Sequence, residues 1–88
     1  MVITDTMILF DLIKDNLPNG FYEDINGNYC CVIGKYLISI CRGVNNVEIE
    51  LFSCLYGCFD NLLDWYIINK VEDVEKYIVQ FIDYIKER

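Results

Sequence analysis

The chain has 88 residues, 55% of them hydrophobic, and its fourteen acidic against seven basic side chains give a formal net charge of −7. The length fits one small domain, residues 1–88, and the apolar content excludes an acidic disordered tail, which would be too polar to form a core. Surplus negative surface on a folded domain favours solubility or a basic partner.

The first predicted element is a helix over residues 5–16. Its apolar side chains recur at i, i+3 and i+4 spacing: Ile8, Leu9, Leu12 and Ile13. Thr4 or Asp5 is suited to cap its N-terminus, because a short oxygen-bearing side chain can accept from the first free backbone N–H groups. Pro18 and the following Gly20 are expected to end it.

A β-meander of three to four antiparallel strands is expected next, because turn residues separate runs rich in β-branched and aromatic side chains. The predicted strands are residues 21–25, 29–33, 36–42 and 47–52. Asn26-Gly27 between the first two is a strong hairpin signal. In the last strand apolar residues alternate with Glu48 and Glu50, which indicates one buried and one exposed face.

Two helices are expected to follow and to pack on one face of the sheet. The first is predicted to begin between residues 57 and 60 and to end near Asn69. The second covers residues 71–88, where apolar side chains recur with helical period: Val71, Val74, Ile78, Phe81, Ile82 and Ile85. Glu72 and Asp73 in its first turn suit the helix dipole. The predicted fold class is therefore α+β.

The sequence predicts a cytoplasmic protein. The N-terminus meets an acid at Asp5 without a preceding basic segment, so it does not resemble a signal peptide. Uncharged stretches such as residues 51–59 are far shorter than the ~20 residues of a membrane span. Five cysteines suit reduced thiols in a cytosol. The chain has no alanine and is rich in Ile, Asn, Tyr, Phe and Lys, whose codons are A/T-rich. This composition indicates a source with low genomic GC: a low-GC bacterium, its phage or plasmid, or an archaeal virus.

Signals for catalysis and for metal binding are weak. Cys54 and Cys58 are four residues apart and would share a face if residues 55–59 were helical. With Cys30, Cys31 or Cys41 they could supply zinc ligands. There is no CxxC pair and no histidine, however, so buried structural thiols are the favoured alternative. The acidic pairs are typical of solvated surfaces and helix starts, and scattered basic residues disfavour direct nucleic-acid binding. We therefore predict a non-enzymatic protein without cofactor or metal.

Aromatic and acidic side chains remain as candidates for a binding surface. Seven tyrosines and one tryptophan offer large contact area with a polar tip. The predicted partner-binding residues are Tyr22, Glu23, Asp24, Tyr29, Tyr36, Glu48, Glu50, Glu72, Asp73, Tyr77, Asp83 and Tyr84. The alternative is that the tyrosines line a small core while the acids keep the protein in solution.

A short N-terminal helix, a hairpin turn, an acidic strand and an acidic closing helix correspond to Asp5–Asn16, Asn26-Gly27, Glu48-Ile49-Glu50 and Glu72–Arg88. In this architecture and charge the chain resembles the small phage-encoded anti-CRISPR proteins. The resemblance implies an inhibitor from a mobile genetic element that fills a basic channel of a CRISPR effector as a nucleic-acid mimic. Two alternatives remain open: an antitoxin or immunity protein for a basic nuclease, and a structural accessory protein that forms homodimers or larger homo-oligomers.

Overall fold

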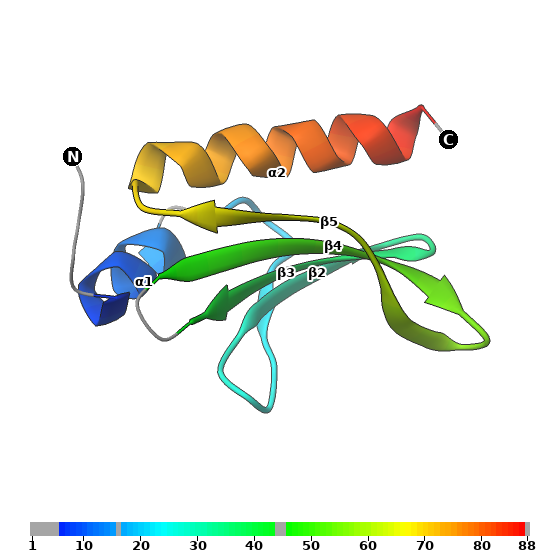
Figure 1. Ribbon diagram of the computed structural model, residues 1–88, viewed down its shortest axis with the longest axis horizontal. Coiled ribbons are helices and arrows are strands. Elements are labelled where there is room, and N and C mark those ends of the chain that lie inside the picture. The colour runs from blue at the N-terminus through cyan, green and yellow to red at the C-terminus, as the bar shows by residue number, and fades with distance from the viewer. Residues whose placement is uncertain (1–5, 16, 44–45, 88) are drawn as a thin grey trace.

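In the computed structural model, the described part of the chain forms two helices that cover one face of a five-stranded antiparallel sheet (Figure 1). The structure describes residues 6–15, 17–43 and 46–87. The elements are α1 (Thr6–Asp15), β1 (Tyr22–Glu23), β2 (Tyr29–Ile33), β3 (Tyr36–Arg42), β4 (Val47–Leu55), β5 (Cys58–Ile68) and α2 (Val71–Lys86). The strands lie in the sheet in chain order, and each pairs antiparallel with the next. The α+β prediction is therefore confirmed, with more strands and fewer helices than expected.

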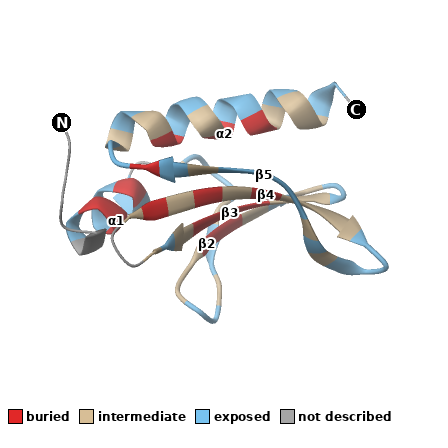
Figure 2. Ribbon diagram, viewed as in Figure 1, coloured by how far each residue is buried: buried red, intermediate tan, exposed pale blue. Residues whose placement is uncertain are grey.

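The hydrophobic core lies between the two helices and the face of the sheet that they cover, called the covered face below (Figure 2). Strand side chains of this face meet across the ladder, as in the row Tyr29, Ile40, Ile49 and Tyr66. The most deeply buried strand residues are Ile38, Ile40, Val47, Ile49, Leu51 and Ile68. Alternation along each strand sends every second side chain to this face, which explains why β4 is buried at Val47, Ile49 and Leu51 only.

The predicted N-terminal helix is confirmed as α1. Leu9, Phe10 and Ile13 are buried in the core. The Phe10 ring stacks on Tyr29 with 5.2 Å between ring centroids, and the Arg42 guanidinium lies 5.4 Å from the Phe10 ring. This stacking joins α1 to β2 and β3. The predicted caps Thr4 and Asp5 and the predicted last residue Asn16 lie outside the described residues.

The predicted C-terminal helix is confirmed as α2. Val74, Ile78 and Phe81 recur at helical spacing and are buried against the sheet. Full burial of such a side chain contributes about 1.5–3 kcal/mol, so this stripe is the main reason why α2 docks. Glu72 and Asp73 lie in its first turn and Lys86 in its last, where their charges oppose the helix dipole favourably. Of the helices that the structure describes, neither is long and apolar enough to cross a membrane.

The prediction of a helix that ends near Asn69 is wrong, because residues 58–68 form the longest strand of the sheet, β5. The apolar residues of this segment fit a helical period by coincidence, while its β-branched and aromatic content favours a strand. The deciding feature is a two-residue turn between β4 and β5. Tyr56 (φ 52°) and Gly57 (φ 82°) both adopt the left-handed region, as a type I′ hairpin turn requires.

Strand boundaries also differ from the prediction around the first hairpin. The predicted strand over residues 21–25 is only two residues long in β1. Asp24 ends it, because its Oδ1 atom accepts from the backbone N–H groups of Asn26 (2.8 Å) and Asn28 (2.9 Å). The hairpin at Asn26-Gly27 therefore exists, but its loop is longer than a two-residue turn. The strand predicted over residues 47–52 continues to Leu55.

Candidate functional site

The face of the sheet opposite the helices, called the open face below, consists of three rows of side chains that cross the strands. The first row is Tyr22, Cys30, Ser39, Glu50 and Trp65, and it touches all five strands. The second row is Val32, Leu37, Phe52 and Leu62. The third row is Cys41, Glu48 and Ile67. Because each residue is the register partner of its neighbour in the row, these side chains project together from one face.

Large apolar side chains are exposed on the open face. Trp65 is 51% exposed, Ile67 50%, Leu62 47% and Val32 45%. Single exposed hydrophobic residues are ordinary on protein surfaces, but a contiguous group of them is typical of an interaction site. Both helices pack on the covered face, so neither shields this group (Figure 1).

The charges on the open face are all negative. Among the described strand positions in its three rows, only Glu48 and Glu50 are charged at neutral pH. Both are half-buried, since Trp65 and Ile67 are their register neighbours on β5. A carboxylate bordered by apolar groups interacts with a cation more strongly than one surrounded by water, because the local dielectric is lower.

A chain of hydrogen bonds holds Glu50 in place. The Cys41 thiol donates to Glu50 Oε1 (3.2 Å), and its sulfur lies 3.2 Å from the Ser39 hydroxyl oxygen. The Cys30 sulfur lies 3.7 Å from the same hydroxyl oxygen and 3.5 Å from Asp24 Oδ2. Burial raises the pKa of the Cys41 thiol to about 12, and its hydrogen bond to Glu50 acts in the same direction. The thiol therefore keeps its proton at neutral pH and stays a donor to Glu50.

Cys30 and Cys31 have the properties of structural thiols rather than of nucleophiles. Burial raises the pKa of Cys30, and burial alone raises that of Cys31, so neither is poised as a thiolate nucleophile. Cys54 and Cys58 do not share a helical face, because they lie on strands on either side of the Tyr56-Gly57 turn. Among the described residues, no group of three or more His, Cys, Asp or Glu side chains is close enough to hold a metal ion.

The predicted sheet residues divide between two faces. Tyr22, Glu48 and Glu50 lie on the open face. Tyr29 is instead buried under α1, and the half-buried Tyr36 meets Tyr84 of α2 edge-on, with 6.4 Å between ring centroids. Glu23 is exposed and is the register partner of Tyr29, while Asp24 closes the loop after β1 and contacts the open-face Cys30. These residues therefore do not form one patch.

The predicted helix residues lie on the side of α2, away from the open face. Glu72 and Asp73 form its first turn, and a backbone hydrogen bond from its own N–H lowers the pKa of Glu72. Tyr77 stacks on Tyr66 of β5 with 4.0 Å between ring centroids, which gives it a structural role. Tyr84 packs on Tyr36, and Asp83 is exposed. The structure brings none of these residues to Glu48 or Glu50.

The exposed apolar residues of the open face escaped the sequence analysis. Leu62, Trp65 and Ile67 fall in the segment that was expected to be a helix, where Ile67 would have lain on the opposite side from Trp65. The i, i+2 spacing of Trp65 and Ile67 is the signal that could have placed them on one face of a strand. Their register with Glu50 and Glu48 depends on pairing with β4, which is not local in sequence.

Comparison of the chain with protein-family models, with curated proteins and with solved structures gave no match. Function is therefore inferred from the chemistry of the open face.

Proposed function

We propose that this protein is a non-enzymatic binding protein whose open face covers a basic, nucleic-acid-binding surface of another protein, as anti-CRISPR inhibitors do. One observation supports the proposal above the others: among the described strand positions in the three rows of the open face, Glu48 and Glu50 are the only charged residues, and exposed apolar side chains border them. Proteins that bind nucleic acid occur in the cytoplasm of a bacterial or archaeal host, and we propose that this protein acts there.

Basic side chains complement this face in both of their parts. Lysine and arginine carry an alkyl stem that packs on apolar surface and a cationic head that needs an anionic acceptor. On the open face the heads would meet Glu48 and Glu50, and the stems would lie on Trp65 and Ile67. Tryptophan is among the residues that contribute most to binding when it is central in an interface.

A nucleic acid is a poor partner for the same face. Phosphates would approach the two carboxylates on a chain of net charge −7, without the basic contacts that supply most of the affinity for nucleic acids. A protein that itself binds nucleic acid has the opposite charge on its binding surface. The open face would compete with nucleic acid for that surface.

In the test, the protein competes with labelled target DNA for purified CRISPR effector–guide complexes. The fluorescence anisotropy of the DNA measures how much of it stays bound. We expect the wild-type protein to displace DNA at low salt and to lose affinity at about 500 mM salt. The double variant Glu48→Lys/Glu50→Lys should lose at least about 100-fold in affinity, since each broken charge pair costs several kcal/mol. The same competition assay with basic nuclease toxins in place of the effectors tests the alternative that the protein is an antitoxin.

The matched control is Glu75→Lys/Glu87→Lys, which changes the net charge equally at two exposed positions on the helix side. It should displace DNA within about threefold of the wild type. Equal losses in both double variants would show that net charge alone drives binding, and no displacement by the wild type would reject inhibition of these effectors.

Self-association through the same face is the outcome that favours a homo-oligomer. The exposed Trp65, Ile67, Leu62 and Val32 would be covered in a dimer, although the acidic pairs of both copies would then approach each other. Trp65 is the only tryptophan of the chain, so its fluorescence reports directly on this face. A dimer that persists at high salt and shields Trp65 from iodide would replace the inhibitor proposal.

A further inference from the structure

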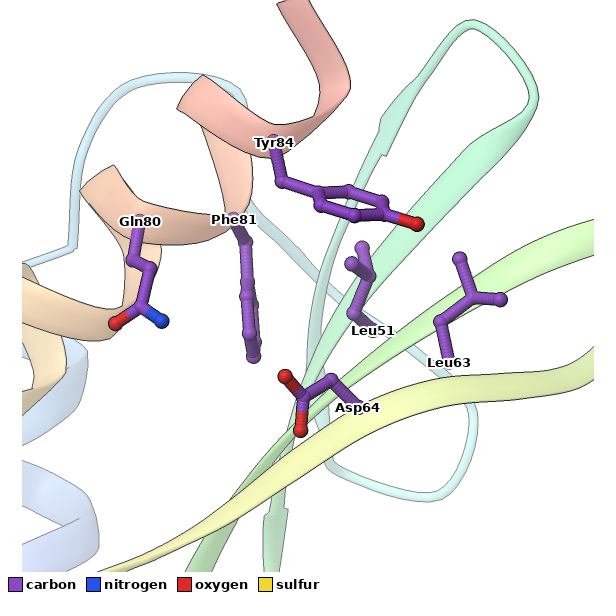
Figure 3. Close-up of a pocket in the computed structure, with 6 residues that line it drawn as sticks. All are labelled: Leu51, Leu63, Asp64, Gln80, Phe81 and Tyr84. Carbon is purple, nitrogen blue, oxygen red and sulfur yellow. The ribbon is translucent and has the colours of Figure 1, made fainter. Parts of the chain in front are cut away.

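A cavity of about 120 Å³ lies between α2 and β5 and opens to solvent (Figure 3). The residues that line it are Leu51, Leu63, Asp64, Gln80, Phe81 and Tyr84. Leu51 and Phe81 belong to the buried core, so the cavity reaches the apolar interior. It lies on the helix side of the sheet and is separate from the open face.

A β-bulge in β5 creates the cavity. Leu51 pairs with Asp64 and Phe52 with Leu62, so Leu63 is an extra residue without a partner on β4. The bulge lets Leu63 and Asp64, which are neighbours in the chain, both line the space beneath α2. In a regular strand two successive side chains would point to opposite faces. The bulge thus places a carboxylate beside an apolar wall.

Among the described residues that line the cavity, Asp64 is the only charged one, and Figure 3 shows its carboxylate pointing into the space below Phe81 and Tyr84. Its Oδ1 atom accepts from the backbone N–H of Trp65 (2.9 Å), and Oδ2 lies 3.4 Å from the Tyr66 hydroxyl. A carboxylate has about four acceptor positions. These two contacts therefore leave Asp64 with capacity for a further donor.

We infer that this cavity binds one basic side chain, a lysine or arginine of a partner that reaches past the edge strand β5 to the helix side, with the alkyl stem in the apolar part and the cationic head on Asp64. Its volume is close to that of a cavity of ~150 Å³ that holds benzene, so it accommodates one stem. A purely apolar side chain would displace water from the remaining acceptor positions of Asp64 without supplying a donor, which is unfavourable. An anionic group would be repelled.

The inference depends on the proposed function in one respect only, namely that the basic side chain belongs to the protein partner. The site itself can be tested on the isolated protein with small cations. The probes are n-butylammonium, which represents lysine, and n-propylguanidinium, which represents arginine. 1-Butanol has a similar stem without the charge, and sodium chloride controls for ionic strength.

The experiment is an NMR titration that follows the methyl groups of Leu51 and Leu63 and the side-chain amide of Gln80. We expect saturable shifts with at least one of the two cations and weaker binding of 1-butanol. In Asp64→Asn, which keeps an oxygen for the Trp65 N–H, the affinity for the cation should fall about tenfold. The matched control is Asp60→Asn, which removes one charge from an exposed position of β5 outside the cavity lining and should bind as the wild type does.

Three results would overturn the inference. They are shifts no larger than those in sodium chloride, equal binding of 1-butanol and the cations, and equal loss of affinity in both variants. The better of the two cations tells whether lysine or arginine is the preferred side chain. If the cation binds but no effector is inhibited, the cavity assignment stands while the proposed function fails.

Discussion

Replacement of Phe81 by alanine is the sharpest test of how α2 is attached to the sheet. Phe81 is 2% exposed, and its ring lies 5.8 Å from the ring of Tyr66, measured between centroids. Removing the ring loses about 1.5–3 kcal/mol of apolar burial and about 0.5–1.5 kcal/mol of aromatic pairing. With the cavity left behind, the expected loss is about 3–5 kcal/mol in the free energy of unfolding.

Such a loss is large for a chain of this length. A domain of 88 residues has a total stability of about 4–13 kcal/mol. For a domain this small, each kcal/mol lowers the melting temperature by about 4–8 °C, so Phe81→Ala should melt at least ~12 °C below the wild type. Far-UV circular dichroism during heating, together with urea unfolding, measures both quantities.

The matched control is Val79→Ala in the same helix, because Val79 is 51% exposed. Its stability should lie within about 0.5 kcal/mol of the wild type. A loss below about 1 kcal/mol in Phe81→Ala, or an equal loss in Val79→Ala, would refute the packing of α2 through its Val74, Ile78 and Phe81 stripe.

Three further predictions concern the turn after β4 and the thiols. Because Tyr56 has a left-handed backbone that favours asparagine or glycine, Tyr56→Asn should raise stability by about 0.5–1 kcal/mol; a loss in urea unfolding would instead show that the tyrosine ring stabilises the hairpin. Iodoacetamide at about pH 8 should modify the exposed Cys58 before Cys30 and Cys41, as read by peptide mass spectrometry. Because the folded pKa of Cys41 is raised from 9.0 to about 12, its contribution to stability is present below pH 9.0 and is lost as pH rises towards 12; an alkaline loss of stability as steep in Cys41→Ala as in the wild type would contradict this.

The elements that the sequence predicted correctly are those with strong local patterns. α2 carries an apolar stripe with charges suited to each end, and α1 carries a shorter stripe that a proline follows. β2 and β3 were predicted at their observed boundaries, because glycine-containing turns flank short β-branched runs.

The error at β5 has a physical cause in the turn before it. A type I′ turn usually carries asparagine or aspartate before glycine, and here Tyr56 occupies that position. Without a recognised turn, nothing local indicated that residues 58–68 fold back on β4. The pairing with β4, which is not local, then overrides the helical spacing of Leu62, Leu63 and Tyr66.

By itself the sequence determined the charge, the amount of apolar surface and the elements with clear periodicity, because these depend on composition and on neighbours within a few residues. Only the tertiary structure decided which side chains share a surface. Strand register placed Glu48 and Glu50 beside Ile67 and Trp65 and sent Tyr29 to the core. A one-residue change in register would have exchanged the two faces, and the bulge at Leu63 did so locally to open the cavity at Asp64.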